Sequence, residues 1–247
     1  MRRRRLAVML AMTILALAQH VVARAQNAAA TQPSPSAMTA SNAPPAGAIV
    51  LFDGHDESHW IYMKGGGPTT WPIVGDAMEV RGGNIVTKDK FGDFTLHVEF
   101  WCPNLPPNVK GQGRGNSGVY LQDRYEIQVL DSYGVDPMGL GDCGAIYNQK
   151  IPDVNACLPP EQWQTYDIKF RAARFDASGK KTDNARVTVV QNGQTIHQDV
   201  EIKEPTGEGK PESPEPGPIR LQDHGNRVRF RNIWIVPAAG AAGKDAK

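Results

Sequence analysis

The chain has 247 residues and a nearly balanced charge, with 27 Lys and Arg residues against 26 Asp and Glu residues. Beyond the arginine-rich amino terminus, the basic residues are scattered among acidic ones. Nucleic-acid-binding proteins usually carry a basic patch or stripe, so we expect no nucleic-acid partner. The spacing of the cysteines does not match a zinc site either.

Residues 1–25 have the layout of a secretory signal peptide. A run of arginines precedes an apolar stretch at 6–17, and Ala23-Arg24-Ala25 forms a small-x-small cleavage signal. The apolar stretch is shorter than the roughly 20 residues that a membrane span requires, although an uncleaved anchor is the alternative. We therefore predict export to the periplasm or the extracellular space, with no membrane span in the mature form.

The rest of the chain divides by composition into a linker, one domain and a tail. Residues 26–48 are rich in Ala, Ser and Pro and lack periodic apolar positions, so they are predicted to be disordered. Residues 49–237 have the length of one domain with a sizeable core. Residues 238–247 are predicted to be a disordered tail.

Three cysteines follow the predicted signal peptide. Export would place them in a compartment that permits disulfides. Cys143 and Cys157 flank a short irregular segment and are candidates for a disulfide, which would leave Cys102 as the odd thiol. Connectivity does not follow from sequence alone, so unpaired thiols are the equal alternative.

Strand signals dominate from Ile49 onward. FTLHVEFW (94–101) alternates with the period of a half-buried strand. Two tight hairpins are predicted, one turning at Asp123-Arg124 and the other at Asn192-Gly193. Further predicted strands are WQTYDIKFRA (163–172), PIRLQ (218–222) and VRFRNIWIV (228–236).

No long segment shows helical periodicity. Many short strands joined by Gly- and Pro-rich turns predict an all-β sandwich or barrel. The segment KEPTGEGKPESPEPGP (203–218) contains too many prolines for a strand. It is predicted to be a surface loop at the edge of the sandwich.

The stretch GNSGVYLQDRYEIQVLDSYG (115–134) combines strand periodicity with acidic and amide side chains. In a strand, Glu126 and Gln128 project from one face, opposite Ile127 and Val129. Asp131 would join Glu126 only if the strand contained a bulge after Val129.

Other polar and aromatic side chains are predicted to extend this face. Tyr120 and Gln122 come from the preceding strand, and His97 and Glu99 from another strand. Aromatic rings beside carboxylates and amides suit a carbohydrate cleft, whereas an ordinary solvent-exposed sheet face is the alternative.

Seven blocks of the sequence, taken in order, resemble the 3-keto-disaccharide hydrolase domain family. They are LFDGHDESHW, DFTLHVEFW, GNSGVYLQDRYEIQVLDSYG, CGAIYNQ, PPEQWQTYDIKF, VQNG and GPIRLQDHGNRVRFRNIWI. The resemblance runs from about Val50 to Ile235. It implies a concanavalin A-like jelly-roll β-sandwich of two antiparallel sheets, in exported bacterial proteins. It also implies cleavage of glycosides and disaccharides that carry a ketone at sugar carbon 3, which an oxidoreductase partner would have to supply.

A ketone at carbon 3 acidifies the proton on carbon 2, so a base could remove that proton and the group on carbon 1 could leave by β-elimination. Hydration of the resulting enone would complete a net hydrolysis. Glu126 is the predicted base, and His224 is the predicted acid or second base, since imidazoles change charge near neutral pH. The predicted substrate- or enolate-binding residues are Asn116, Tyr120, Arg124, Gln128, Tyr147, Glu99, Asp131 and Gln222.

No fixed-spacing motif demands a cofactor. A divalent metal ion is nevertheless a candidate, because carboxylates and imidazole are suitable ligands. Its predicted ligands are Glu126, Asp131 and His224, with Glu99 as a further donor.

Two other functions stay open. A non-catalytic, lectin-like module would use the same cleft without needing a carboxylate of perturbed pKa. An ordinary glycosidase is the other, because Glu126, Gln128 and Asp131 have a spacing similar to the E-x-D-x-x-E strand motif of jelly-roll β-glucanases. A retaining glycosidase needs two carboxylates about 5 Å apart, however, and the amide in the middle of the motif departs from that pattern.

Overall fold

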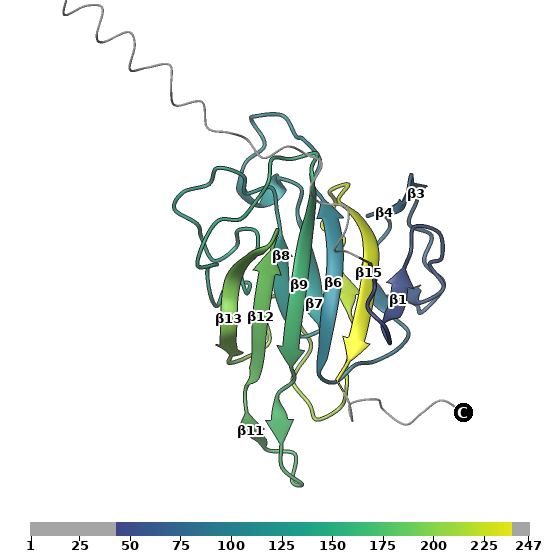
Figure 1. Ribbon diagram of the computed structural model, residues 1–247, viewed down its shortest axis with the longest axis vertical. Coiled ribbons are helices and arrows are strands. Elements are labelled where there is room, and N and C mark those ends of the chain that lie inside the picture. The colour runs from purple at the N-terminus through teal and green to yellow at the C-terminus, as the bar shows by residue number, and fades with distance from the viewer. Residues whose placement is uncertain (1–42, 239–247) are drawn as a thin grey trace, which may run out of the picture. The chain divides into compact units, whose positions relative to one another are not determined.

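The computed structural model describes residues 43–238, and their regular structure is almost entirely β (Figure 1). The larger sheet, sheet A, has eight strands. They are β13 (Gln194–Ile202), β12 (Ala185–Gln191), β9 (Trp163–Arg171), β6 (Phe94–Trp101), β15 (Arg229–Pro237), β4 (Ala77–Glu79) and β3 (Ile73–Val74) in spatial order, with β1 (Ile49–Phe52) paired to β15.

The second sheet, sheet B, lies behind sheet A in Figure 1. Its spatial order is β2 (Trp60–Tyr62), β5 (Ile85–Thr87), β14 (Arg220–Leu221), β7 (Ser117–Leu121) and β8 (Tyr125–Val129). A two-stranded ribbon of β10 (Arg174–Phe175) and β11 (Lys181–Asp183) and one turn of 3-10 helix, η2 (Gly111–Gly113), complete the described elements. All strand pairs are antiparallel, so the fold is the predicted jelly-roll β-sandwich.

One apolar core lies between the two sheets. The alternating residues Phe94, Leu96, Val98 and Phe100 of β6 are buried in the same cluster as the apolar residues of β7 and β8. Aromatic pairs fill the space between strands, as in Phe100 and Tyr166, whose ring centroids lie 4.6 Å apart. Full burial of each large apolar side chain contributes about 1.5–3 kcal/mol, so these alternating positions account for the stability of the sandwich.

Both predicted hairpins are present. Asn192 and Gly193 join β12 to β13 with φ of 50° and 79°, as a tight turn with two positive φ angles requires. The β7–β8 turn has three residues, Gln122 to Arg124, where a two-residue turn at Asp123-Arg124 was predicted, and the φ angles of Gln122 and Asp123 are 56° and 58°.

The edge strand β8 is covered by two irregular segments. Gln128 N donates to Ala145 O at 3.0 Å, and Tyr147 N donates to Glu126 O at 3.2 Å. The 203–218 segment, predicted as a loop at the sandwich edge, runs along the other part of β8, where Thr206 N donates to Arg124 O at 3.0 Å. It therefore forms a wall over the outer face of sheet B.

Of the two alternatives for the cysteines, the structure has the unpaired one. Cys102, Cys143 and Cys157 are all buried free thiols. Gln191 Nε2 lies 3.5 Å from both Cys143 Sγ and Cys157 Sγ, so the candidate pair is close in space but unpaired. Tyr166 Oη lies 3.2 Å from Cys143 Sγ, and these polar contacts satisfy the thiol inside the core.

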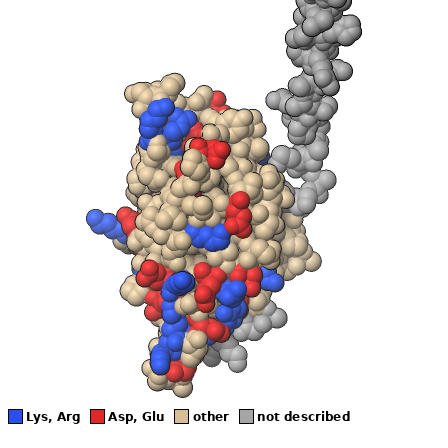
Figure 2. All heavy atoms as spheres, turned by 90° about the vertical axis from the view of Figure 1, so that its left-hand side faces the viewer, with Lys and Arg blue, Asp and Glu red and all other residues tan. Residues whose placement is uncertain are grey.

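Acidic and basic side chains are interspersed on the face drawn in Figure 2. Within residues 43–238 there is no helix long and apolar enough to cross a membrane. The predicted signal peptide, most of the predicted linker and nearly all of the predicted tail fall outside the described residues.

Candidate functional site

A cavity of about 220 Å³ opens on the outer face of sheet B. Its walls come from β7, β8, the 203–218 segment and the loops around η2, Tyr147 and His224. The lining residues are Gln112, Asn116, Tyr120, Glu126, Gln128, Tyr147, Gly207, Glu208, Gln222 and His224.

The cavity brings together most of the side chains predicted to form the site. Those are Asn116, Tyr120, Glu126, Gln128, Tyr147, Gln222 and His224. The sequence did not indicate Gln112, Gly207 or Glu208, because Gln112 lies in a single turn of 3-10 helix and the other two in an irregular segment, and neither shows periodicity. The one feature of the sequence that could have pointed to Gly207 and Glu208 as site residues was their position within the Pro-rich 203–218 segment.

Glu126 is the buried acid of this cavity, with only 3% of its surface exposed. Tyr120 Oη donates to Glu126 Oε2 at 2.8 Å, and Glu126 N donates to Thr206 Oγ1 at 2.6 Å. Burial raises the pKa of Glu126 to about 7, although the Tyr120 hydrogen bond and the charge of Arg220 act to lower it. The carboxyl group can therefore both take up and return a proton near neutral pH.

Glycines on two sides leave room for this carboxylate. A Cβ on Gly118 would lie 2.3 Å from Glu126 Oε1, and one on Gly207 would lie 3.1 Å from Glu126 Oε2. Gly207 also has a φ of 49°, which favours glycine. Larger side chains at either position would displace the acid.

Tyr120 lies between Glu126 and a buried cation. The guanidinium carbon of Arg220 lies 3.5 Å from the centroid of the Tyr120 ring. Burial raises the pKa of Tyr120 well above its usual value, so the phenol is neutral and donates its hydrogen bond to Glu126. Arg220 is held by Asp123, whose Oδ1 lies 3.0 Å from Arg220 Nε.

Amide side chains line the rest of the cavity. Gln128 Nε2 donates to Gly141 O at 3.1 Å, which fixes the orientation of the amide because a carbonyl oxygen can only accept. Asn116 Nδ2 donates to Gln112 O and Oε1 at 2.8 and 3.0 Å. Gln128 Oε1 and Gln222 Oε1 are buried without a hydrogen-bond partner among the described residues. Both oxygens are acceptors suited to the hydroxyl groups of a sugar.

His224 lies at the exposed side of the cavity, in the loop that follows β14. The loop is fixed by its neighbour Asp223, whose N donates to Asn84 Oδ1 at 2.7 Å and whose Oδ1 accepts from Gly225 N at 2.8 Å. His224 therefore lies on an anchored loop at the exposed side of the cavity.

The structure places Arg124 away from the cavity, contrary to its predicted role as a substrate ligand. Its guanidinium donates to Gln122 Oε1 at 2.8 Å, Ser213 Oγ at 2.6 Å and Glu215 O at 2.9 Å. Arg124 thus fastens the 203–218 segment to the hairpin that carries Glu126.

Glu99 also lies elsewhere, because β6 belongs to sheet A and β8 to sheet B. The outward-facing residues of these two strands are on opposite sides of the sandwich. Glu99 accepts from Arg231 Nε at 2.7 Å and Asn232 Nδ2 at 2.9 Å. His97, on the same face, pairs with Asp167 at 2.7 Å. Alternation had indicated the correct face of each strand but not which sheet the strand joins.

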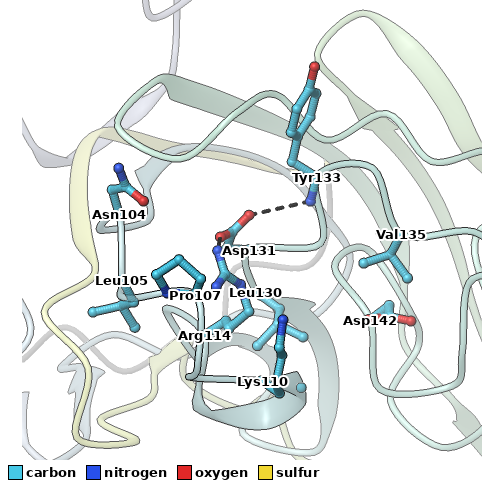
Figure 3. A pocket seen from close by; sticks show the side chains of 11 residues that line it. Asn104, Leu105, Pro107, Lys110, Arg114, Leu130, Asp131, Tyr133, Val135 and Asp142 are labelled. Atoms are coloured by element: carbon cyan, nitrogen blue, oxygen red, sulfur yellow. Dashed lines mark hydrogen bonds and ion pairs between the residues drawn. The ribbon is translucent and has the colours of Figure 1, made fainter.

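Asp131 lines a separate hollow of about 440 Å³ (Figure 3). The strand ends at Val129, so the hypothesised bulge is not needed and does not bring Asp131 beside Glu126. Asp131 instead pairs with Arg114 and lies near Tyr133 N, as the dashed lines in Figure 3 show. The two carboxylates of the predicted glycosidase motif do not share a cavity.

The candidate metal ligands are likewise divided. Glu126 and His224 line one cavity, whereas Asp131 and Glu99 lie in two other places. Among residues 43–238 no group of three or more His, Cys, Asp and Glu side chains is arranged to hold a metal ion.

Residues 47–236 match the 3-keto-alpha-glucoside-1,2-lyase-like domain family. The chain belongs to this family. No curated protein matches the chain. A crystal structure from Parabacteroides distasonis ATCC 8503, described as a candidate glycosyl hydrolase, is 41% identical with a TM-score of 0.70, covering 78% of this chain and 84% of that one.

A second structure from the same organism, given the same description, is 19% identical with a TM-score of 0.56. It covers 79% of this chain and 98% of its own. At that identity the likeness shows the sandwich fold alone. Membership of the lyase-like family and the 41% identical structure support a carbohydrate-active, hydrolase-like enzyme, and the cavity around Glu126 is the candidate active site.

Proposed function

We propose that the protein cleaves 3-keto-glycosides by proton abstraction at carbon 2, β-elimination and hydration. The observation that carries the proposal is the buried carboxyl of Glu126, with a pKa of about 7, in a small cavity lined by hydrogen-bonding groups. A general base works best when its pKa lies near the operating pH. The family description, which names a 1,2-lyase acting on a 3-keto-α-glucoside, agrees with this chemistry.

The reaction begins when Glu126 takes the proton from carbon 2. The electrons of the C2–H bond form a C2=C3 double bond, and the carbonyl electrons move to the oxygen on carbon 3. That enolate then collapses: the C3=O bond reforms, a C1=C2 bond forms, and the C1–O bond breaks. His224 at the cavity mouth supplies the proton that the leaving oxygen takes up.

Hydration completes the cycle. Water adds to carbon 1 of the enone and gives its spare proton to His224, which lost one to the leaving oxygen. Glu126 returns its proton to carbon 2, so both the carboxylate and the protonated imidazole are regenerated. The products are a free 3-keto sugar and an alcohol, so the sum of the steps is a hydrolysis with no change of oxidation state.

The cavity volume supports recognition of a single sugar ring. About 220 Å³ is smaller than the roughly 300–1,000 Å³ of pockets that enclose a whole drug-sized ligand. We infer that the oxidised ring enters the cavity, with Asn116, Gln128, Tyr147 and Gln222 around it, and that the leaving group stays outside.

Two further parts of the proposal rest on the sequence and the chemistry. The signal-peptide layout of residues 1–25 supports export. An oxidoreductase that oxidises carbon 3 of a glycoside must supply the substrate, because this reaction itself transfers no electrons.

The test is release of the aglycone from a 3-keto-glucoside and from its unoxidised parent. We expect release from the keto compound only, lowered at least about 100-fold in Glu126→Gln, since general-base catalysis contributes about 10²–10⁴-fold. The control is Glu201→Gln, an exposed acid on β13, which should keep full activity. Release from the parent would instead indicate an ordinary glycosidase, and binding without release a lectin-like module.

A further inference from the structure

Arg220 is a buried cation next to the candidate site, and packing of the core alone does not explain a charged side chain there. Only 1% of its surface is exposed, and it is the cross-strand partner of Tyr120 in the β14–β7 pair. Cross-strand partners project from the same face of a sheet, so the guanidinium stacks on the phenol ring at 3.5 Å. Taking a charge out of water is costly unless it is paired, and the buried Asp123 provides the pair at 3.0 Å.

The surroundings hold this stack in one geometry. Arg220 Nη2 donates to Glu208 O at 3.3 Å, which ties the guanidinium to the 203–218 segment. Lys210 Nζ lies 2.7 Å from the second oxygen of Asp123. The Arg220 side chain does not line the cavity, so the groups that meet a ligand are Tyr120 and Glu126 and not the cation behind them.

The proposed reaction needs a donor beside the base. When the proton leaves carbon 2, negative charge develops on the oxygen of the adjacent carbon 3. A donor for that oxygen must lie close to the group that takes the proton. Tyr120 Oη lies 2.8 Å from Glu126 Oε2, which accepts its single proton while Glu126 is ionised. Once Glu126 has taken the carbon 2 proton, it no longer needs that hydrogen bond, and the Tyr120 hydroxyl can turn to donate to the enolate oxygen.

A cation on the ring face strengthens a phenol as a donor, because it stabilises the charge that the oxygen gains as it gives up its proton. Arg220 acts in this direction by lowering the pKa of Tyr120 against the larger, raising effect of burial. The other charged or titratable groups around the pair are Glu208 from the 203–218 segment, His224 from the loop after β14 and Tyr147 from the loop after β8.

We propose that Tyr120 donates the hydrogen bond that stabilises the enolate oxygen, and that Arg220, anchored by Asp123, is the positioning residue that polarises Tyr120. This inference rests on the proposed function. In the first step the C2–H electron pair becomes the C2=C3 bond, the proton goes to Glu126, and the carbonyl π electrons go to the oxygen held by Tyr120. Tyr120 keeps its proton throughout.

The test isolates enolate formation by using a 3-keto sugar that lacks a leaving group, 3-keto-1,5-anhydroglucitol. Exchange of its carbon 2 proton in D₂O, followed by NMR, reports the first step, and calorimetry reports binding of the same compound. In Arg220→Met we expect exchange to fall about 10- to 30-fold, as loss of a desolvated cation–π contact implies, while the Kd stays within about twofold. Arg220→Lys, which keeps the charge but loses the planar stack, should restore part of the rate.

Two comparisons separate polarisation from a structural role. Tyr120→Phe combined with Arg220→Met should exchange no more slowly than Tyr120→Phe alone, because Arg220 acts through the Tyr120 hydroxyl. Arg229→Met removes another stacked arginine, 4.6 Å from the Trp101 ring on sheet A, and should leave exchange unchanged. If Arg220→Met does not fold, Asp123→Asn is the second variant. It removes the carboxylate that anchors Arg220, and we expect it to slow exchange in the same way.

Additive losses in the double variant, or an equal weakening of binding and exchange, would overturn the inference in favour of a structural role. Unchanged exchange in a folded Arg220→Met would overturn it as well. A wild-type protein that binds the compound but exchanges no proton would overturn the proposed function itself, and that outcome is distinguishable because it involves no variant.

Discussion

At the scale of single residues, the surroundings of Glu126 set the pKa of its carboxyl group. Burial raises the pKa of Glu126 from its ordinary value of 4.5 to about 7, because its effect exceeds the lowering effects of the Tyr120 hydrogen bond and of Arg220. The carboxylate form is the base, so activity on a 3-keto-glucoside should rise as pH increases through about 7. A pH profile of kcat/KM checks this prediction. An acidic limb with an apparent pKa near the ordinary value for glutamate would contradict the burial of Glu126.

The same shift predicts an effect on stability with the opposite pH dependence. Between about pH 4.5 and 7 the folded state holds a proton that the unfolded state has released, so stability falls as pH rises through this window. Above pH 7 the buried carboxylate costs about 3 kcal/mol at most, at 1.36 kcal/mol per pKa unit. Glu126→Gln should therefore be more stable than wild type at pH 8 and equally stable at pH 4, measured by urea unfolding. A variant less stable than wild type at pH 8 would show that Glu126 has a stabilising partner when ionised.

At the scale of elements, the β7–β8 hairpin and the 203–218 segment together make the site. The hairpin supplies Tyr120 and Glu126, and the segment covers them from the side. Strand periodicity alone predicts that these side chains share a face. The segment has no periodicity, so its contacts with Arg124, and hence the enclosure of the cavity, did not follow from sequence.

Gly118 on β7 offers a test of how the hairpin holds the acid. A Cβ at this position would meet the end of the Glu126 side chain at 2.3 Å, so Gly118→Ala should displace the carboxylate without breaking the sheet. We expect kcat to fall at least about tenfold, since small misplacements of catalytic groups are costly, while the melting temperature changes little. The control is Gly67→Ala, where a Cβ meets no neighbouring atom. Full activity in Gly118→Ala would contradict the arrangement of the carboxylate over β7.

The sequence predicted strands and faces better than it predicted which strands are neighbours. Alternation identified the outward positions of β6 and β8, and Asn192-Gly193 marked its turn. Nothing local determines that β6 joins sheet A while β8 joins sheet B, because pairing depends on contacts far apart in the chain. Glu99 was therefore assigned to the wrong side of the sandwich, and Asp131 was assigned to a strand that ends before it.

At the scale of the whole molecule, one continuous core encloses all three cysteines. Cys102 and Cys143 have no exposed surface, and Cys157 has 8%. A thiol reagent should consequently react with none of them quickly in the native protein and with all three after unfolding in denaturant without a reductant. Detection of only one reactive thiol in the unfolded protein would indicate that the Cys143–Cys157 pair had become oxidised.

The covering of β8 has a consequence beyond the site. An outermost strand with free backbone groups can recruit a strand from another molecule, which leads to self-association. Here the backbone N–H and C=O groups on the outer edge of β8, from Arg124 to Gln128, form hydrogen bonds with Thr206 and the 144–147 segment. The segments that enclose the Glu126 carboxyl therefore also cover the backbone groups of β8 that could otherwise pair with a strand of another molecule. We expect that loosening these segments to admit larger ligands would carry a risk of aggregation.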